Sequence, residues 1–264
     1  RLILEGRVED DEAGLHFYEM AIKASGAVQA SRWTSLPNGL GYICSFNGPH
    51  SLFSDTIRSL RILGLAHKLG HVLMGENDKP ISLLQRLIQH AQTTALYNVY
   101  YGEGRDSYDV PGRVVHESIF NVTDGNYRCP STQQGYSPFS TWTRGLAWVL
   151  CGYPEQLEYF ETLSDDEVSE FVVPEEFRQQ SLRAATATAD FIIENSCADG
   201  IPFWDTGAPG LANLPDYREH PSDPDNDFEP VDSSASNICG QGLWRLSKYL
   251  DQKGEQPADV GPEV

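Results

Sequence analysis

Long segments in which apolar residues recur every three or four positions dominate this chain. That spacing places apolar side chains on one face of an α-helix. Only residues 113–128 combine β-branched and aromatic residues around a turn, Asp124-Gly125, that is typical of a β-hairpin. The fold is therefore expected to be mostly helical. The predicted helices run from about Asp11 to Ser25, Ser54 to Met74, Asp78 to Tyr100, Ser140 to Leu163, Pro174 to Ser196 and Asp232 to Leu250.

Residues that start and stop helices indicate how these segments connect. Gly75 is placed to end the second helix, and Asp78 with Pro80 is placed to begin the third, which predicts an αα-hairpin. Ser140 and Asp232 are expected to cap the helices that follow them. Successive hairpins of this kind build toroids, and in a toroid the loops at one end form the binding site.

Composition narrows the function classes. The 264 residues, 40% of them hydrophobic, suffice for a sizeable core. A formal net charge of -19 argues against nucleic acid and anionic membrane surfaces as partners, because both are negatively charged. No run reaches the roughly 20 apolar residues of a membrane span. The five cysteines form no C-x-x-C pair, so a structural zinc site is not expected.

Two groups of potential metal ligands lack the neighbouring residues that known metal sites need. Asp223, Asp225 and Asp227 alternate as in a calcium loop, but Phe228 stands where that loop needs glycine. His67 and His71 lie four residues apart without the Glu of a zinc-protease helix. We predict no metal and no cofactor.

The segment from Gln134 to Trp148 concentrates side chains suited to carbohydrate. It supplies an amide, a phenol, two indoles and a guanidinium around one predicted helix start. The helix dipole gives Arg144 no stabilisation there, so this arginine is expected to face an anion brought from elsewhere. One such anion is a ligand, and another is one of the chain's many acidic side chains.

Four ordered motifs then resemble one family. Gln134-Gly-Tyr136, the segment from Ser140 to Trp148, Asp199-Gly-Ile-Pro-Phe-Trp-Asp205 and Asp232-Ser-Ser-Ala235 look like unsaturated glucuronyl hydrolases, glycoside hydrolase family 88. The related unsaturated rhamnogalacturonyl hydrolases, family 105, match the tryptophan and arginine segment less closely. The resemblance extends over most of residues 50–250. It implies an (α/α)6 barrel, of which residues 1–264 would form one incomplete domain, because six long helices are predicted where a barrel has twelve.

The resemblance also implies a reaction. Such enzymes remove a Δ4,5-unsaturated uronic acid from the non-reducing end of oligosaccharides that polysaccharide lyases produce. An aspartate protonates the vinyl ether and assists water attack on the neighbouring carbon, and the resulting hemiketal opens and releases the sugar. The expected partner is therefore an unsaturated uronyl oligosaccharide. The resemblance implies bacterial carbohydrate breakdown, and it leaves open the compartment (cytoplasm or periplasm), the sugar and the oligomeric state.

Asp55 is the position that resembles the catalytic aspartate, in Ser54-Asp-Thr-Ile-Arg-Ser-Leu60. A helix start lowers the pKa of a carboxyl group, whereas a proton donor needs a raised pKa. Burial among aromatic side chains would therefore have to outweigh the helix dipole. Without the resemblance, Asp55 reads as an ordinary acid that stabilises its own helix.

Five further residues resemble substrate-binding positions. His116 precedes Gln134 by eighteen residues, as the pocket histidine of the family does. Gln134 and Arg144 would surround the uronate, and Trp142 and Trp204 could stack on sugar faces.

One departure keeps other functions open. The family has a second important aspartate in a His-Asp-x-Gly-Phe-like context, and nothing between Arg1 and Ser54 matches it. A catalytically silent sugar-binding module is therefore an alternative. An ordinary glycosidase is another, and it would need a second carboxylate from Glu76, Glu103 or Asp205.

Overall fold

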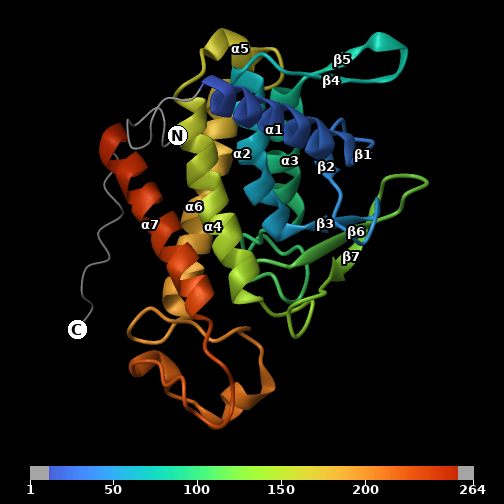
Figure 1. The fold of residues 1–264 in the computed structure, drawn as a ribbon. Coiled ribbons are helices and arrows are strands. Elements are labelled where there is room, and N and C mark those ends of the chain that lie inside the picture. Colours follow the sequence, from blue (N-terminus) through green and yellow to red (C-terminus); the bar gives the residue numbers. More distant parts are fainter. Residues whose placement is uncertain (1–11, 255–264) are drawn as a thin grey trace.

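Helices form most of the computed structural model, which describes residues 12–254 (Figure 1). The helices are α1 (Glu12–Ser31), α2 (Leu60–Lys68), α3 (Leu83–Tyr97), α4 (Thr143–Phe160), α5 (Asp165–Ser169), α6 (Pro174–Glu194) and α7 (Ser233–Lys253). Short 3-10 helices are η1 (Ser54–Ser59), η2 (Glu76–Asp78), η3 (Pro209–Asn213) and η4 (Tyr217–Glu219). The strands are β1 (Trp33–Ser35), β2 (Gly41–Ile43), β3 (Ser51–Phe53), β4 (Leu73–Met74), β5 (Pro80–Ile81), β6 (Glu117–Phe120) and β7 (Tyr127–Ser131).

Helix α4 lies at the centre of the helical layer. It packs against α6 and α7 on one side and against α2 and η1 on the other, while α1 and α3 pack on α2 (Figure 1). The main core fills the space between these helices, with Leu60, Leu87, Leu150 and Phe160 fully buried in it. The predicted mostly helical fold with stacked helical hairpins is confirmed.

Two glycines on α4 let η1 approach closely. A Cβ added at Gly152 would lie 2.8 Å from Ile57, and one at Gly145 would lie 2.7 Å from the Trp142 ring and 3.2 Å from Ser54 Oγ. Such distances leave no room for a methyl group. The seven-residue spacing puts both glycines on one face of α4, so η1 is held against the first half of this helix.

A three-stranded antiparallel sheet, β3-β6-β7, covers the end of the helical layer next to η1. The β6–β7 pair confirms the predicted hairpin, with its turn around Gly125 at φ 71°. In the β3–β6 pair, Phe53 stands opposite Glu117, and the Ser54 N–H donates to the His116 carbonyl at 2.8 Å. This register brings two segments that are sixty residues apart in sequence to one place.

Two predicted helix boundaries are wrong. The second helix ends at Lys68 rather than near Met74, because Gly70 adopts φ 73° and the chain then forms the β4–β5 hairpin. The third helix begins at Leu83 with Ser82 as its cap, so Asp78 does not start it.

The start of the fourth helix also differs from the prediction. Trp142 rather than Ser140 occupies the N-cap position of α4. The Ser140 hydroxyl instead donates to the Ser137 carbonyl.

The first helix is longer than predicted, because α1 ends at Ser31 rather than near Ser25. The other boundaries agree more closely. Helix α6 starts at Pro174, and the Asp232 side chain caps α7 by accepting from the Ala235 N–H at 2.8 Å. The long loop between α6 and α7 lies beyond the N-terminal ends of α4 and α7 (Figure 1). The tail after Gly254, which the sequence leads us to expect to be frayed, lies outside the described residues.

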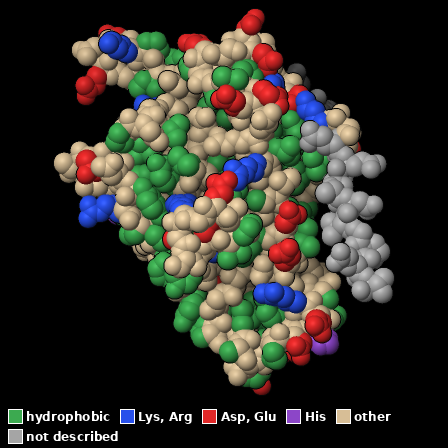
Figure 2. Space-filling model, turned by 180° about the vertical axis from the view of Figure 1, so that it is seen from behind, with side chains coloured by type: hydrophobic (Ala, Val, Ile, Leu, Met, Phe, Trp, Pro, Cys, Tyr) green, Lys and Arg blue, Asp and Glu red, His purple; other side chains and the backbone are tan. Residues whose placement is uncertain are grey.

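Acidic side chains are scattered over the surface among hydrophobic and neutral ones (Figure 2). Within residues 12–254, no helix has the length and apolar character that crossing a membrane requires.

Candidate active site

Asp55 lies in the first turn of η1, directly after β3. Only 7% of the residue is exposed, and its two carboxylate oxygens face different groups. Oδ2 lies 3.5 Å from Arg58 Nη2, and Oδ1 lies 3.9 Å from His116 Nε2. Burial raises the pKa of Asp55 above its ordinary value, and the opposing effects of Arg58 and of a backbone N–H do not cancel this rise. A carboxyl group of this kind is suited to exchange protons at a higher pH than an exposed aspartate.

His116 is a neutral hydrogen-bond donor beside Asp55. Its Nδ1 accepts from the Gln133 N–H at 3.0 Å, which leaves the ring proton on Nε2, the atom that faces Asp55. Burial lowers the pKa of His116 to about 4, although nearby Glu117 acts in the opposite direction. The ring is therefore uncharged at neutral pH. The β3–β6 register and the turn after β7 fix its position.

Three buried polar atoms on Ser54, Asp55 and His116 have no hydrogen-bond partner among the described residues. They are Ser54 Oγ, Asp55 Oδ1 and His116 Nε2. A buried polar group without a hydrogen bond costs about 1–3 kcal/mol, so such groups are rare in native proteins. Two of them, Asp55 Oδ1 and His116 Nε2, lie 3.9 Å apart, which indicates a place where water or a ligand supplies the missing bonds.

Aromatic rings enclose the histidine. Phe53 lies 4.4 Å from the His116 ring centroid, and Trp142 meets the same ring edge-on at 4.9 Å. Trp142 is only 6% exposed, so it encloses the site instead of presenting a face to solvent. Half-exposed Trp148, one and a half turns along α4, lies beneath the Arg58 guanidinium at 5.1 Å. These rings enclose the two neighbours of Asp55, His116 and Arg58, and the burial of Asp55 is the physical cause of its raised pKa.

A second buried carboxylate, Glu117, supports the site and was not identified from the sequence. Its Oε1 accepts from Ser51 Oγ and from Asn47 Nδ2, and its Oε2 accepts from Gln133 Nε2. Burial alone would raise the pKa of Glu117, but these hydrogen bonds outweigh burial and the net pKa is lowered. The ionised carboxylate therefore ties β3, β6 and the turn that holds His116 to one another.

Asp205 anchors the turn from Thr132 to Tyr136 through a backbone hydrogen bond. This fully buried carboxylate accepts from the Tyr136 N–H and from the Gly207 N–H, each at 2.9 Å. Gln134 lies in this turn with an exposed side chain, and its backbone N–H is 3.4 Å from His116 Nδ1. Gln134 and His116 are therefore neighbours.

Arg144 has an acidic side chain as its partner. Its Nε and Nη2 both donate to Asp232 Oδ2, at 3.1 and 2.9 Å, while Asp232 Oδ1 caps α7. Its guanidinium lies 5.7 Å from the Trp142 ring centroid. The sequence left a ligand and an acidic side chain as possible partners of Arg144, and in the structure the partner is Asp232.

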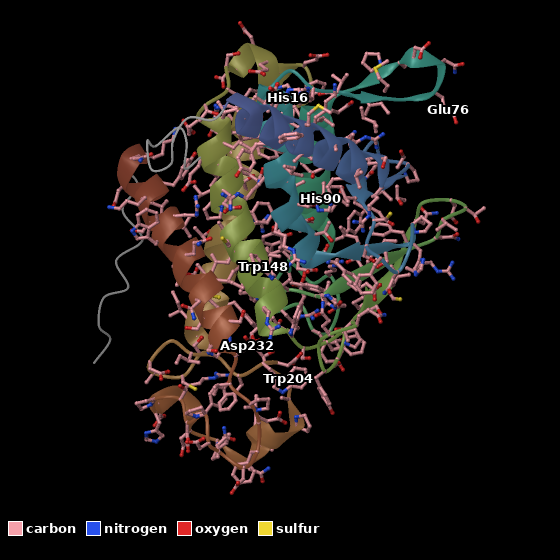
Figure 3. All side chains as sticks on the ribbon, viewed as in Figure 1. His16, Glu76, His90, Trp148, Trp204 and Asp232 are labelled. Carbon is pink, nitrogen blue, oxygen red and sulfur yellow. The ribbon has the colours of Figure 1, made fainter. Side chains whose placement is uncertain are left out.

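Trp204 lies in the long loop near Asp232 and the starts of α4 and α7 (Figure 3). Its Nε1 donates to Glu229 at 2.7 Å, and its carbonyl accepts from the Thr143 N–H. His116 therefore contacts Asp55, Trp142 and the Gln134 backbone, and Arg144 lies beside Trp142. Trp204 is linked to the start of α4 through its carbonyl only.

The carboxylates considered for an ordinary glycosidase lie elsewhere or are occupied. Glu76 is at the tip of the β4–β5 hairpin, at the opposite end of the molecule from Trp204 (Figure 3). Glu103 pairs with Arg183, and Asp205 accepts two backbone N–H groups. This geometry gives no support to a two-carboxylate mechanism.

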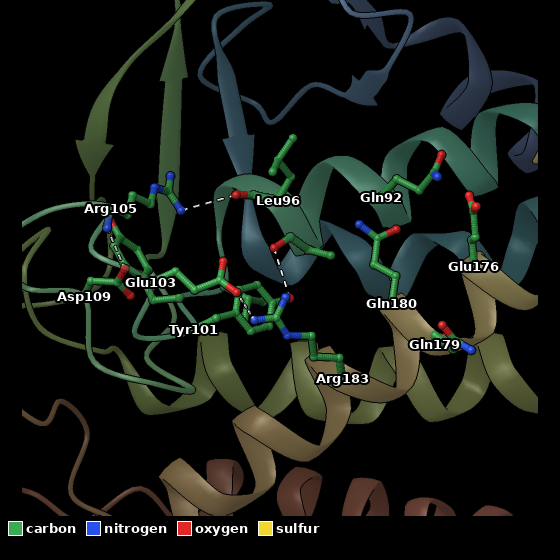
Figure 4. A pocket seen from close by; sticks show the side chains of 13 residues that line it. Gln92, Leu96, Tyr101, Glu103, Arg105, Asp109, Glu176, Gln179, Gln180 and Arg183 are labelled. Atoms are coloured by element: carbon green, nitrogen blue, oxygen red, sulfur yellow. Dashed lines mark hydrogen bonds and ion pairs between the residues drawn. The ribbon is translucent and has the colours of Figure 1, made fainter.

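Two cavities lie apart from Asp55. One of about 590 Å³ is bounded by α3, α6 and the loop after α3, and it is lined by Gln92, Tyr101, Arg105, Gln180 and Arg183 (Figure 4). Another of about 300 Å³ lies within the loop before α7. Neither shares a lining residue with the site around Asp55. Within the described part of the chain, no group of three or more His, Cys, Asp or Glu side chains is arranged to hold a metal ion.

Comparison with known proteins identifies relatives of one kind. No protein-family model matches the chain. The unsaturated glucuronyl hydrolase of Formosa agariphila is 27% identical over 168 residues, which are 63% of this chain and 32% of that protein. The solved unsaturated glucuronyl hydrolase of Bacillus sp. GL1 has a TM-score of 0.60 at 21% identity, covering 97% of this chain and 53% of that one. A complex of such an enzyme with dGlcA-Glc-Rha-Glc has a TM-score of 0.59 at 22% identity, with the same two coverages.

The chain thus spans about half the length of these solved relatives. The resemblance inferred from the four motifs is confirmed by relatives that carry the same name. The chain is similar in sequence to unsaturated glucuronyl hydrolases, and it has the α/α-toroid fold of the part of them that it covers.

Proposed function

We propose that this chain carries the acid-base centre of a glycoside hydrolase that hydrates Δ4,5-unsaturated uronic acids at the non-reducing ends of oligosaccharides. The observation that carries the proposal is that Asp55 Oδ1 and His116 Nε2, both buried and without a hydrogen bond among residues 12–254, lie 3.9 Å apart, with aromatic rings around the histidine. The similarity to proteins named unsaturated glucuronyl hydrolase supports the same reaction.

Asp55 acts first as an acid and then as a base. Its proton passes to C4 of the double bond, and the carbon next to it, C5, becomes electron-poor. Water then adds to C5 and returns a proton to the Asp55 carboxylate, so the group ends the cycle as it began. The hemiketal formed at C5 opens and releases the rest of the oligosaccharide. One carboxyl group with a raised pKa performs both steps, and no second carboxylate is needed.

His116 positions the reacting groups without exchanging its own proton. Since its Nδ1 is held by the Gln133 N–H, the Nε2 proton is free to donate to the attacking water or to Asp55. Its lowered pKa keeps it neutral, so it does not stabilise the ionised form of Asp55 as a cation would.

Exposed Gln134, next to His116, is a proposed contact to the uronate, and half-buried Trp204 is a proposed contact to the sugar that leaves. Trp142 is proposed to line the pocket through its edge, because its faces are buried. Arg144 is proposed to stay paired with Asp232 and to lie at the border of the site.

The test is incubation of the protein with an unsaturated uronyl disaccharide, whose double bond absorbs in the ultraviolet. The proposal expects absorbance to fall, and in D₂O it expects one deuterium at C4 of the product. Saturable binding with constant absorbance would instead support a silent sugar-binding module. Hydrolysis of a saturated disaccharide would support an ordinary glycosidase.

A further inference from the structure

Arg58 is a cation beside Asp55 whose N–H groups form no hydrogen bond among the described residues. Its Nη2 lies 3.5 Å from Asp55 Oδ2, yet among the described residues Arg58 donates no hydrogen bond. Arg144 differs, because two of its N–H groups are bonded to Asp232. Arg58 is therefore the guanidinium at this site that is able to accept a new anionic partner.

The orientation of Arg58 is fixed from two sides. The guanidinium lies 5.1 Å above the Trp148 ring, and the Asp55 carboxylate lies at its edge. The face of the indole and the carboxylate both attract the cation, so the guanidinium is held close to Asp55. Such preorganisation lowers the entropy lost when a carboxylate binds to both N–H groups of one edge.

Arg58 also lies on the open side of Asp55. Its side chain is 54% exposed, whereas the His116 side chain is 1% exposed and Trp142 is 6% exposed. A ligand that reaches Asp55 from solvent therefore passes Arg58 and not the histidine. The cation Arg58 therefore lies between the Asp55 carboxyl group and solvent.

The chemistry of the substrate places an anion at the same point. In a Δ4,5-unsaturated uronic acid, the carboxylate is bonded to C5, next to the carbon that Asp55 protonates. Once Asp55 has given its proton to C4, two carboxylates lie side by side, which is unfavourable unless a cation lies between or beside them. Arg58 occupies that position.

We propose that Arg58 binds the carboxylate of the unsaturated uronic acid and so selects substrates that carry an anion next to the double bond. This inference rests on the proposed function. Arg58 is then a substrate-binding residue on η1 itself, three residues from the acid that it serves.

The test compares two substrates and three variants. The substrates are an unsaturated uronyl disaccharide and its methyl ester, which lacks the negative charge. The variants are Arg58→Gln, Arg58→Lys and the control Arg61→Gln. Arg61 is equally exposed on the next turn but pairs with Glu155, which Arg245 also contacts. Thermal unfolding of each variant verifies that it is folded.

Arg58→Gln is expected to lower kcat/KM for the free acid about 10- to 100-fold, mainly through KM, as loss of a charge-assisted pair does. Its kcat/KM for the ester should stay within about twofold, so the preference for acid over ester disappears. Arg58→Lys should recover part of the preference, and Arg61→Gln should keep all of it.

An unchanged ratio of acid to ester in folded Arg58→Gln would overturn the inference and leave the proposed function standing. Absence of turnover by the unmodified protein would overturn the proposed function and the inference with it.

Discussion

Replacing Glu117 by Gln tests whether the buried carboxylate supports the site. The change keeps the shape of the side chain but removes its charge and turns one oxygen into an N–H donor. Glu117 accepts from three side chains, Ser51, Asn47 and Gln133, so an amide must place its NH₂ group against at least one donor. Hydrogen bonds to a charged group contribute about 1.5–3 kcal/mol each, against about 1 kcal/mol for neutral ones. Loss of the charge and one unsatisfied donor should together cost about 2–4 kcal/mol at pH 7.

Urea unfolding at several pH values measures this cost. Because the pKa of Glu117 is lowered in the folded protein, its stabilisation is present above pH 4.5 and is lost as pH falls through the folded-state pKa. The difference between the two proteins should therefore shrink in acid. The control is Glu103→Gln, an exposed acid paired with Arg183, with an expected effect below about 1 kcal/mol. A Glu117→Gln variant as stable as the Glu103→Gln variant at pH 7 would refute the reasoning.

Two further predictions concern stability. The pKa of His116 falls from 6.5 to about 4 on folding, so stability should decrease as pH drops from about 6.5 to 4, by up to about 3 kcal/mol, and His116→Gln should flatten this part of the profile of Tm against pH. A variant whose profile matches the parent would contradict this. Gly152→Ala places a methyl group 2.8 Å from Ile57 and should cost about 1–3 kcal/mol, whereas Gly240→Ala meets nothing within 4 Å and should gain about 0.5–1 kcal/mol. Calorimetry that finds both alanine variants equally stable would show that α4 and η1 are not closely packed.

Local patterns predicted the parts of the fold that local interactions determine. The helix from Pro174 begins with a residue suited to the first helical turn, and Asp232 caps α7 through its own side chain. The β6–β7 hairpin follows from the turn at Gly125. In each of these elements the decisive contact is made within a few residues of the chain.

Boundaries set by tertiary contacts were not predictable in the same way. The apolar spacing continues past Lys68, but the chain leaves the helix at Gly70 and pairs Met74 with Pro80. Ser140 is a good cap by residue type, yet α4 begins two residues later, where the Thr143 N–H donates to the carbonyl of distant Trp204. Preference for a residue type yields to such contacts.

The site residues show the same difference between local and long-range interactions. The family resemblance predicted Asp55 and His116 as site residues, and the β3–β6 register brings these two side chains together. No local signal marked Glu117, because its three partners lie on other segments. The partner of Arg144 is Asp232, 88 residues away, so the sequence could not show which anion this arginine faces. Local sequence patterns do not predict pairs that lie this far apart in the chain.

The most direct test of the acid-base role is Asp55→Asn, measured for both turnover and binding of the unsaturated disaccharide. An amide has the same shape but cannot deliver or recover the proton, so kcat should fall about 10²- to 10⁴-fold while the disaccharide still binds. Because burial disfavours the ionised Asp55, the variant should also unfold at a temperature no lower than the parent at pH 7. The same substitution at exposed Asp78 should leave the rate unchanged. A folded, substrate-binding Asp55→Asn protein that retains the parent's kcat would contradict the account.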